Sequence, residues 1–273
     1  MLSRVKRYIP ADIEILYLTL GGSHLYGTAD ENSDTDIWGI CRCKEMFHFS
    51  TARENSPNTK NDVDILLLPE EEFVRRLSAG DIKAIDILFS YTCPSCILWG
   101  SADYIKVFVP YLNWHVSSVC SYIYEELRGY PVYGSMLWKI RKTIEIFSLY
   151  SSDIPLWDIL SRVEIPLDTY TYEISGKKRI GVSAYNKKIQ DVPVDKAVDI
   201  LRSLYVSRLR ADFRYKNMMH AIRTTAEFSA YSVFSEVFFP LPESKILLKI
   251  KHGYYPWYEL MDRVNMFLGR SCL

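Results

Sequence analysis

Two aspartates separated by a single residue, Asp34 and Asp36, are the side chains whose spacing most clearly suggests chemistry. They lie near the end of residues 21–39, "GGSHLYGTADENSDTDIWG". On an extended segment, residues two apart face the same side, so the two carboxylates are expected to lie together. Like charges held that close are costly unless a cation lies between them, and carboxylate oxygens suit Mg²⁺ or Mn²⁺. The pair therefore predicts a divalent-cation site.

A third carboxylate on a neighbouring strand would complete a site for two ions. Residues 62–68, "DVDILLL", predict a buried strand that opens with Asp62 and Asp64. An unpartnered acid beside such an apolar run is costly, and the two acids point to the same face by the period of two. The residue pattern leaves Asp62 and Asp64 as competing candidates.

The small residues before the aspartates predict a phosphate-binding turn. Gly22 and Ser23 directly follow residues 14–20, "EILYLTL", which predict a buried strand. A turn of small residues lets a ligand approach the backbone, whose N–H groups bind phosphate oxygens. His24 could donate a hydrogen bond to such a phosphate or only cap the turn.

The surrounding pattern predicts an α+β protein in two parts. Residues 1–105 alternate strand and helix signals, which indicates a small mixed β-sheet backed by helices, with a mobile polar loop at residues 50–62. Residues 106–273 read as mostly amphipathic helices. Within them, residues 167–192 predict a hairpin around Ser175 and Gly176, with basic residues 177–179 at its tip.

Charge and cysteine usage narrow the class of protein. The net charge is zero, but residues 1–127 hold 11 Lys and Arg against 18 Asp and Glu, and residues 128–273 hold 22 against 15. No run approaches the length of apolar residues that a membrane span needs, and no signal peptide is indicated. Six cysteines are too sparse for a disulfide scaffold. Cys93 and Cys96 have zinc spacing without a partner pair, and the spacing of Cys41 and Cys43 is poor geometry for a zinc knuckle, so we expect reduced thiols and a cytoplasmic protein.

These motifs together resemble a known family. The order Gly-Ser, about ten residues, Asp-x-Asp and a later acid is similar to the DNA polymerase β-like nucleotidyltransferases. The longer string, with Tyr26-Gly27 and Ser-Asp-x-Asp, looks like the YcgL-type predicted nucleotidyltransferases of bacteria and phages. The resemblance continues through "DILLLPEEEFVRRLSAGDIKAIDILF", where alignment at Phe73 favours Asp64 over Asp62. It also covers "KNMMHAIRTTAEF", but Asp86 stands where that branch has Glu.

The resemblance implies an activity and assigns roles to residues. It implies transfer of a nucleoside monophosphate from a nucleoside triphosphate (NTP) to a hydroxyl, with release of pyrophosphate and two Mg²⁺ or Mn²⁺ ions as cofactors. The implied catalytic and metal-binding residues are Asp34, Asp36 and Asp64. The implied nucleotide-binding residues are Gly22, Ser23, His24 and Tyr26, together with Lys216, His220 and Arg223, whose spacing places the last three on one helical face.

Three functions from different classes stay open on the sequence. A nucleotidyltransferase that acts on an RNA or tRNA 3′ end accounts for the basic half, the hairpin tip at 177–179, and Lys187 and Lys188. The same chemistry on a protein hydroxyl or a small molecule accounts for the neutral overall charge and for the lack of an RNA-binding module. A binding protein without catalysis is the third, and the three converging acids argue against it.

Overall fold

The computed structural model describes residues 5–51, 62–184, 187–210 and 213–271, and these form two compact units. Unit 1 joins Met1–Ile123 to Tyr215–Pro256, and unit 2 joins Tyr124–Arg214 to Trp257–Leu273. Unit 1 therefore contains two helices that come from the C-terminal part of the chain, beyond the region 1–105 that the sequence patterns grouped together. The loop expected at 50–62 falls almost entirely outside the described residues.

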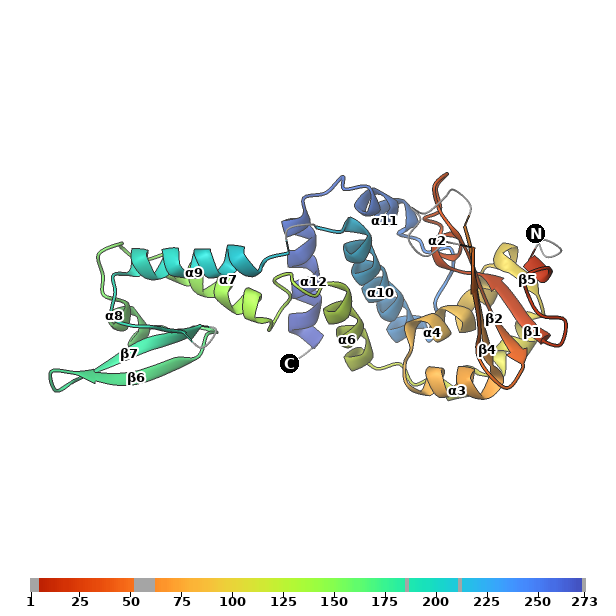
Figure 1. Ribbon diagram of the computed structural model, residues 1–273, viewed down its shortest axis with the longest axis horizontal. Helices are drawn as coiled ribbons and strands as arrows, with labels where there is room; N and C mark the ends of the chain where they lie inside the picture. Colours follow the sequence, from red (N-terminus) through yellow and green to blue (C-terminus); the bar gives the residue numbers. More distant parts are fainter. Residues whose placement is uncertain (1–4, 52–61, 185–186, 211–212, 272–273) are drawn as a thin grey trace. The chain divides into compact units, whose positions relative to one another are not determined.

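A five-stranded mixed sheet forms the centre of unit 1 (Figure 1). Its strand order is β3-β4-β2-β1-β5; β2 and β4 are parallel, and the other neighbouring pairs are antiparallel. The α+β class expected from the sequence is confirmed. The strands are β1 (Glu14–Leu20), β2 (Thr35–Arg42), β3 (Phe47–Ser50), β4 (Val63–Pro69) and β5 (Ile97–Trp99).

Alternation along β2 separates the two faces of this sheet. Ile37 belongs to an apolar cluster with Leu18, Ile65 and Leu67, which covers one face. The even-numbered residues of β2, which include Asp36, point to the opposite face by the period of two. Because both faces of the central strands are covered, these strands read as nearly continuous apolar runs.

Helices pack beside the sheet, and local sequence explains where they begin. Helix α3 starts directly after Pro69 with three acids in its first turn, and it contacts β2 and β4. Helix α4 begins after Asp81, whose carboxylate accepts the Ala84 N–H at 2.9 Å and caps the helix. The helices of unit 1 are α2 (Gly22–Tyr26), α3 (Glu70–Ser78), α4 (Ile82–Phe89), α5 (Ala102–Lys106), the first part of α6 (Val116–Glu126), α10 (Tyr215–Phe234) and α11 (Ser244–Lys251), with 3-10 turns at Ser90–Thr92, Pro94–Cys96 and Val109–Tyr111.

Unit 2 packs helices against a small antiparallel sheet. Buried residues of α7, α8, α9 and the sheet form one apolar cluster, and the predicted hairpin is present, with Ser175 and Gly176 as its left-handed turn. A third strand, β8, pairs with β7. The elements are α7 (Met136–Phe147), α8 (Leu156–Leu160), β6 (Thr169–Ile174), β7 (Lys177–Ala184), β8 (Lys187–Ile189), α9 (Val194–Arg208) and α12 (Trp257–Ser271). Among the described residues, no helix is both long and apolar enough to cross a bilayer.

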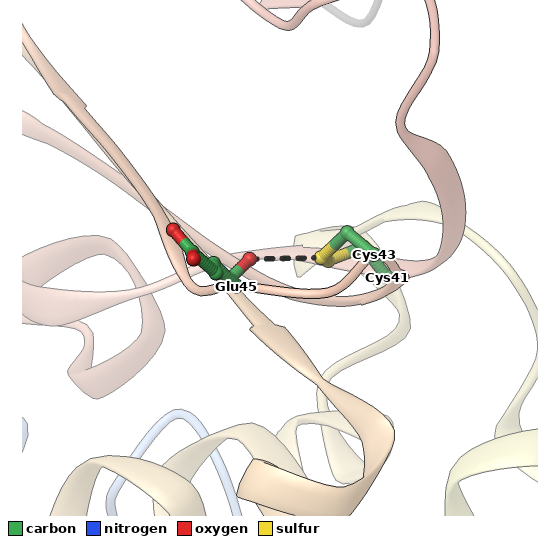
Figure 2. The surroundings of a disulfide bond; sticks show 3 residues. All are labelled: Cys41, Cys43 and Glu45. Atoms are coloured by element: carbon green, nitrogen blue, oxygen red, sulfur yellow. Dashed lines mark hydrogen bonds between the residues drawn. A yellow bond between two sulfur atoms is a disulfide. The ribbon is translucent and has the colours of Figure 1, made fainter.

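The cysteines divide into a bonded pair and buried thiols. Cys41 and Cys43 form a disulfide, with the Cys43 sulfur 3.2 Å from the Glu45 carbonyl oxygen (Figure 2). The expectation of free thiols at this pair is wrong because residues two apart on an extended segment face the same side, so the two sulfur atoms lie together at the end of β2. Cys93, Cys96 and Cys120 are buried thiols outside this disulfide, as expected.

Candidate functional site

A cavity of about 430 Å³ in unit 1 brings together most of the residues singled out from the sequence. Its lining comes from β2, α2, α4 and the N-terminal half of α10. Two expected site residues, His24 and Asp64, do not line it. The expected site residues that do line it are Gly22, Ser23, Tyr26, Asp34, Asp36, Lys216, His220 and Arg223.

The turn after β1 brings its backbone against the carboxylate of Asp36. Gly21 donates its backbone N–H to the Asp36 carbonyl oxygen at 2.9 Å. Gly22 has φ of +53°, and a Cβ at this position would lie 1.9 Å from the Asp36 Oδ2. Only glycine accommodates both the left-handed backbone and this approach. The small-residue turn therefore lies directly against Asp36.

Asp36 and Asp64 are register partners on the parallel strands β2 and β4. Burial raises the pKa of Asp36, and the negative charges of Asp64 and Asp34 raise it further, whereas Lys83 and Lys216 oppose the shift. The three acids thus lie close enough to repel one another. Crowded carboxylates of this kind favour a bound cation.

The third acid is engaged elsewhere in this structure. The Asp64 Oδ1 lies 2.7 Å from the His48 Nε2 on β3, and the side chain of Asp62 accepts a hydrogen bond from Thr51 at 3.2 Å. Within the described part of the chain, no three His, Cys, Asp or Glu side chains converge as metal ligands. The donor chemistry suits a hard divalent ion, and one of the two Asp64 carboxylate oxygens is paired with His48.

Helix α10 presents Lys216, His220 and Arg223 to the cavity, so the single helical face expected from their spacing is confirmed. The charge on that face differs from the expectation. Burial lowers the pKa of His220 to about 3, and the positive charges of Arg223 and Lys216 lower it further. The imidazole is therefore neutral at physiological pH. His24, by contrast, lies on α2 and accepts the Gly27 N–H with its carbonyl oxygen.

Arg223 is fully buried between two carboxylates. Its NH1 lies 2.8 Å from the Glu227 Oε1 and 3.2 Å from the Asp86 Oδ2, and the Tyr26 hydroxyl donates to the same Asp86 oxygen at 2.6 Å. The guanidinium also stacks over the Tyr26 ring at 3.9 Å. Asp86, which stands where the resembled branch has Glu, thus joins Arg223 and Tyr26 in a buried cluster, and burial raises its pKa.

Further lining residues were not found from the sequence. Lys83 lies 5.3 Å from the centre of the Trp38 ring, and Lys251 binds Asp30 at 2.9 Å. Thr28 is completely buried beside the cavity. Isolated lysines and threonines carry no motif, so no sequence signal separated these residues from ordinary surface positions.

Comparison with known proteins yields one weak likeness to report. No family model matches the chain. An uncharacterized 38.9 kDa protein in the nrdC-mobD intergenic region of Enterobacteria phage T4 is 21% identical over 288 residues. The alignment covers 88% of this chain and 83% of the phage protein.

Proposed function

We propose that the chain is a metal-dependent nucleotidyltransferase of the DNA polymerase β-like type, which transfers a nucleoside monophosphate from an NTP to a hydroxyl. The observation that carries this proposal is the shared cavity: Asp34 and Asp36 line it with the Gly22-Ser23 turn, and Asp64 is the register partner of Asp36. Burial raises the pKa of Asp36 and the negative charges of Asp64 and Asp34 raise it further, which is consistent with a site that a cation completes.

The residues divide into those for the metal and those for the nucleotide. Asp34, Asp36 and Asp64 would hold Mg²⁺ or Mn²⁺, which supplies charge neutralisation of the triphosphate and activation of the attacking hydroxyl. The backbone of Gly22 and Ser23 would hold the outer phosphates, and Lys216 adds positive charge on the same cavity wall.

In the reaction, the acceptor oxygen bonds to the α-phosphorus and the bond to pyrophosphate breaks. The protein contributes position and charge, with no covalent intermediate on the chain.

The proposed acceptor is the 3′ hydroxyl of an RNA. Support comes from the β6–β7 hairpin of unit 2, where Lys177 and Lys178 are exposed and two further exposed lysines open β8. Basic residues of this kind neutralise backbone phosphates. Because the proposed reaction uses NTP and cellular RNA as its substrates, we expect the activity in the cytoplasm.

The test incubates the full chain with each α-labelled NTP, Mg²⁺ or Mn²⁺, and a mixture of cellular RNA and protein. Label in RNA supports the proposal as stated. Label in polypeptide that survives nuclease would identify a protein hydroxyl as the acceptor in place of RNA. Label in a small molecule would identify a small molecule as the acceptor.

The matched control is Asp36→Asn, which preserves shape and removes a metal-binding charge. We expect it to lower the labelling rate by about 10²-fold or more. Full labelling by this variant would refute the assignment of the site.

A further inference from the structure

The three-stranded sheet of unit 2 has one face in the core and one face away from it. Val182 and Ile189 are register partners on β7 and β8, and both are buried in the apolar cluster of this unit. Because side chains alternate along a strand, Gly181 and Ser183 of β7 belong to the opposite face. In Figure 1 the turn that joins β6 to β7 projects past α8 and α9. The sheet therefore has a second face that the core of unit 2 does not use.

Aromatic rings and cations gather on this second face. Cross-strand partners share a face, and the partner of Gly181 is Tyr170, while the partner of Arg179 is Tyr172. The Nζ of Lys188 lies 4.9 Å from the centre of the Tyr170 ring. We use the name aromatic face for a set of five residues on these strands: Tyr170, Tyr172, Lys177, Arg179 and Lys188.

Local contacts hold the two tyrosine rings in place. The Tyr170 ring lies against Gly181, where an added Cβ would be 2.6 Å from the ring Cζ. The Tyr170 hydroxyl donates to the Ile189 carbonyl oxygen at 3.2 Å, and the centre of the Tyr172 ring is 5.7 Å from that of Tyr170. Both tyrosines are half-buried. Rings that are already fixed lose little conformational entropy when a flat ligand stacks on them.

Positive charge is concentrated on the same three strands. Together β6, β7 and β8 carry five Lys and Arg residues against one acid, Glu173. The guanidinium of Arg179 stacks over the Trp157 ring of α8 at 3.9 Å, which connects a third ring to the aromatic face. Rings interleaved with cations match a ligand that alternates flat bases with phosphates.

This combination distinguishes among polyanions. The bases of a duplex are stacked on one another and are not available to aromatic side chains, and an acidic peptide has no base to place on the rings. We propose that the aromatic face binds single-stranded RNA, with bases stacked on Tyr170 and Tyr172 and with phosphates neutralised by Lys177, Arg179 and Lys188. This inference rests on the proposed function and specifies its acceptor as an RNA with an unpaired segment.

The experiment measures dissociation constants of the full chain for 5′-fluorescein-labelled RNA by fluorescence anisotropy, without NTP or metal. The probes are an oligouridine of about 12 nucleotides and the duplex that it forms with oligoadenosine. We expect the oligouridine to bind at least about 10-fold more tightly than the duplex, because only the single strand adds stacked bases to the phosphate contacts.

Substitutions at Tyr170 test the stacking. Tyr170→Leu keeps an apolar side chain over Gly181 but removes the ring, so it should weaken oligouridine binding at least about fivefold and leave duplex binding unchanged. Tyr170→Phe keeps the ring and should bind oligouridine nearly as tightly as the wild type.

Two adjacent lysines form a matched pair that tests which face binds. Lys187 and Lys188 are both exposed. Lys187 is the register partner of Ala184, which is buried in the core, whereas Lys188 is the partner of Ser183 on the other face. Lys188→Ala should therefore weaken oligouridine binding more than Lys187→Ala does. If Tyr170→Leu fails to fold, this pair and the wild-type preference for the single strand decide the inference.

The contradicting outcomes separate this inference from the proposed function. Duplex binding as tight as that of oligouridine, or unchanged oligouridine binding by Tyr170→Leu, refutes the aromatic face as a single-strand site. Displacement of oligouridine by polyaspartate as effectively as by unlabelled oligouridine assigns the binding to charge alone and also refutes it. In each case metal-dependent transfer of label to RNA leaves the proposed function standing. Absence of label transfer to every acceptor, with binding of oligouridine that depends on Tyr170, refutes the proposed function and retains the aromatic face as an RNA-binding surface.

Discussion

The buried carboxyl of Glu227 makes the stability of the protein depend on pH in a window where few other groups titrate. Its side chain is 1% exposed, and burial is the main cause that raises its pKa from 4.5 to about 8, with Asp86 adding to the rise and Arg223 opposing it. Between these values the folded state binds a proton that the unfolded chain has released. The stabilisation is complete below pH 4.5 and is lost as the pH rises through 8.

The magnitude follows from the shift. Between pH 6.5 and 8 the unfolding free energy should fall by about 1.5 kcal/mol, because one pKa unit corresponds to about 1.4 kcal/mol. His220 acts in the opposite direction, but only between about pH 3 and 6.5, so it stays outside this window. The pKa of Asp86 is also raised by burial, which acts with the same sign as Glu227. The buried Tyr26, with its pKa raised well above 10, stays protonated throughout.

The assay is urea unfolding followed by circular dichroism at four pH values from 6.5 to 8. Glu227→Gln should flatten the profile, because an amide keeps an acceptor for Arg223 and cannot ionise. Glu72→Gln is the matched control: its arginine partners lower the pKa of Glu72 to about 2, so the substitution changes no slope in this window. A wild-type profile that is flat or rises, or an unchanged slope in Glu227→Gln, would refute the reasoning.

Three further predictions address local structure and the acceptor. Gly22→Ala should lower the melting temperature more than Gly176→Ala, because both have positive φ, but an added Cβ at Gly22 would lie 1.9 Å from the Asp36 Oδ2 whereas one at Gly176 would meet nothing within 4 Å. Calorimetric melting that ranks the two variants in reverse would contradict this. Asp81→Ala removes the cap of α4 and should cost about 1 kcal/mol in chemical unfolding, and no measurable loss would show that the bond to Ala84 is unimportant. Replacing the basic residues 177–179 by Glu reverses their charge and should weaken RNA binding and its salt dependence in filter-binding assays. The affinity for triphosphate is the internal control and should not change.

Periodicity and spacing predicted much of the fold because these signals are local. The three long strands of unit 1 follow from continuous apolar runs, and the helical face of Lys216, His220 and Arg223 follows from spacing alone. The short edge strands β3 and β5 carry too few residues for a recognisable pattern, and both were missed. The disulfide was missed because the spacing of the two cysteines was weighed only against zinc binding, although residues two apart on an extended segment face the same side.

The long-range features of the site had no sequence signal. Asp86 and Arg223 are 137 positions apart, and no local pattern around either residue indicates that they pair. His220 reads as part of a basic face, but burial makes it neutral, and burial belongs to the folded structure. The contact of His48 with Asp64 likewise depends on the pairing of β3 with β4.

The division of unit 1 between two distant stretches of chain sets an order of events during synthesis. All five strands have been made once residue 99 has left the ribosome, but α10, with its wall of the cavity, follows only after most of unit 2. Asp86 precedes Arg223 by 137 residues, which at 5–20 residues per second is roughly 7 to 27 seconds of translation. During that interval the carboxylate that later lies buried has no guanidinium beside it. Completion of the cavity is therefore timed by translation, and a chain released before residue 223 would carry Asp34 and Asp36 without the complete α10 wall of the cavity.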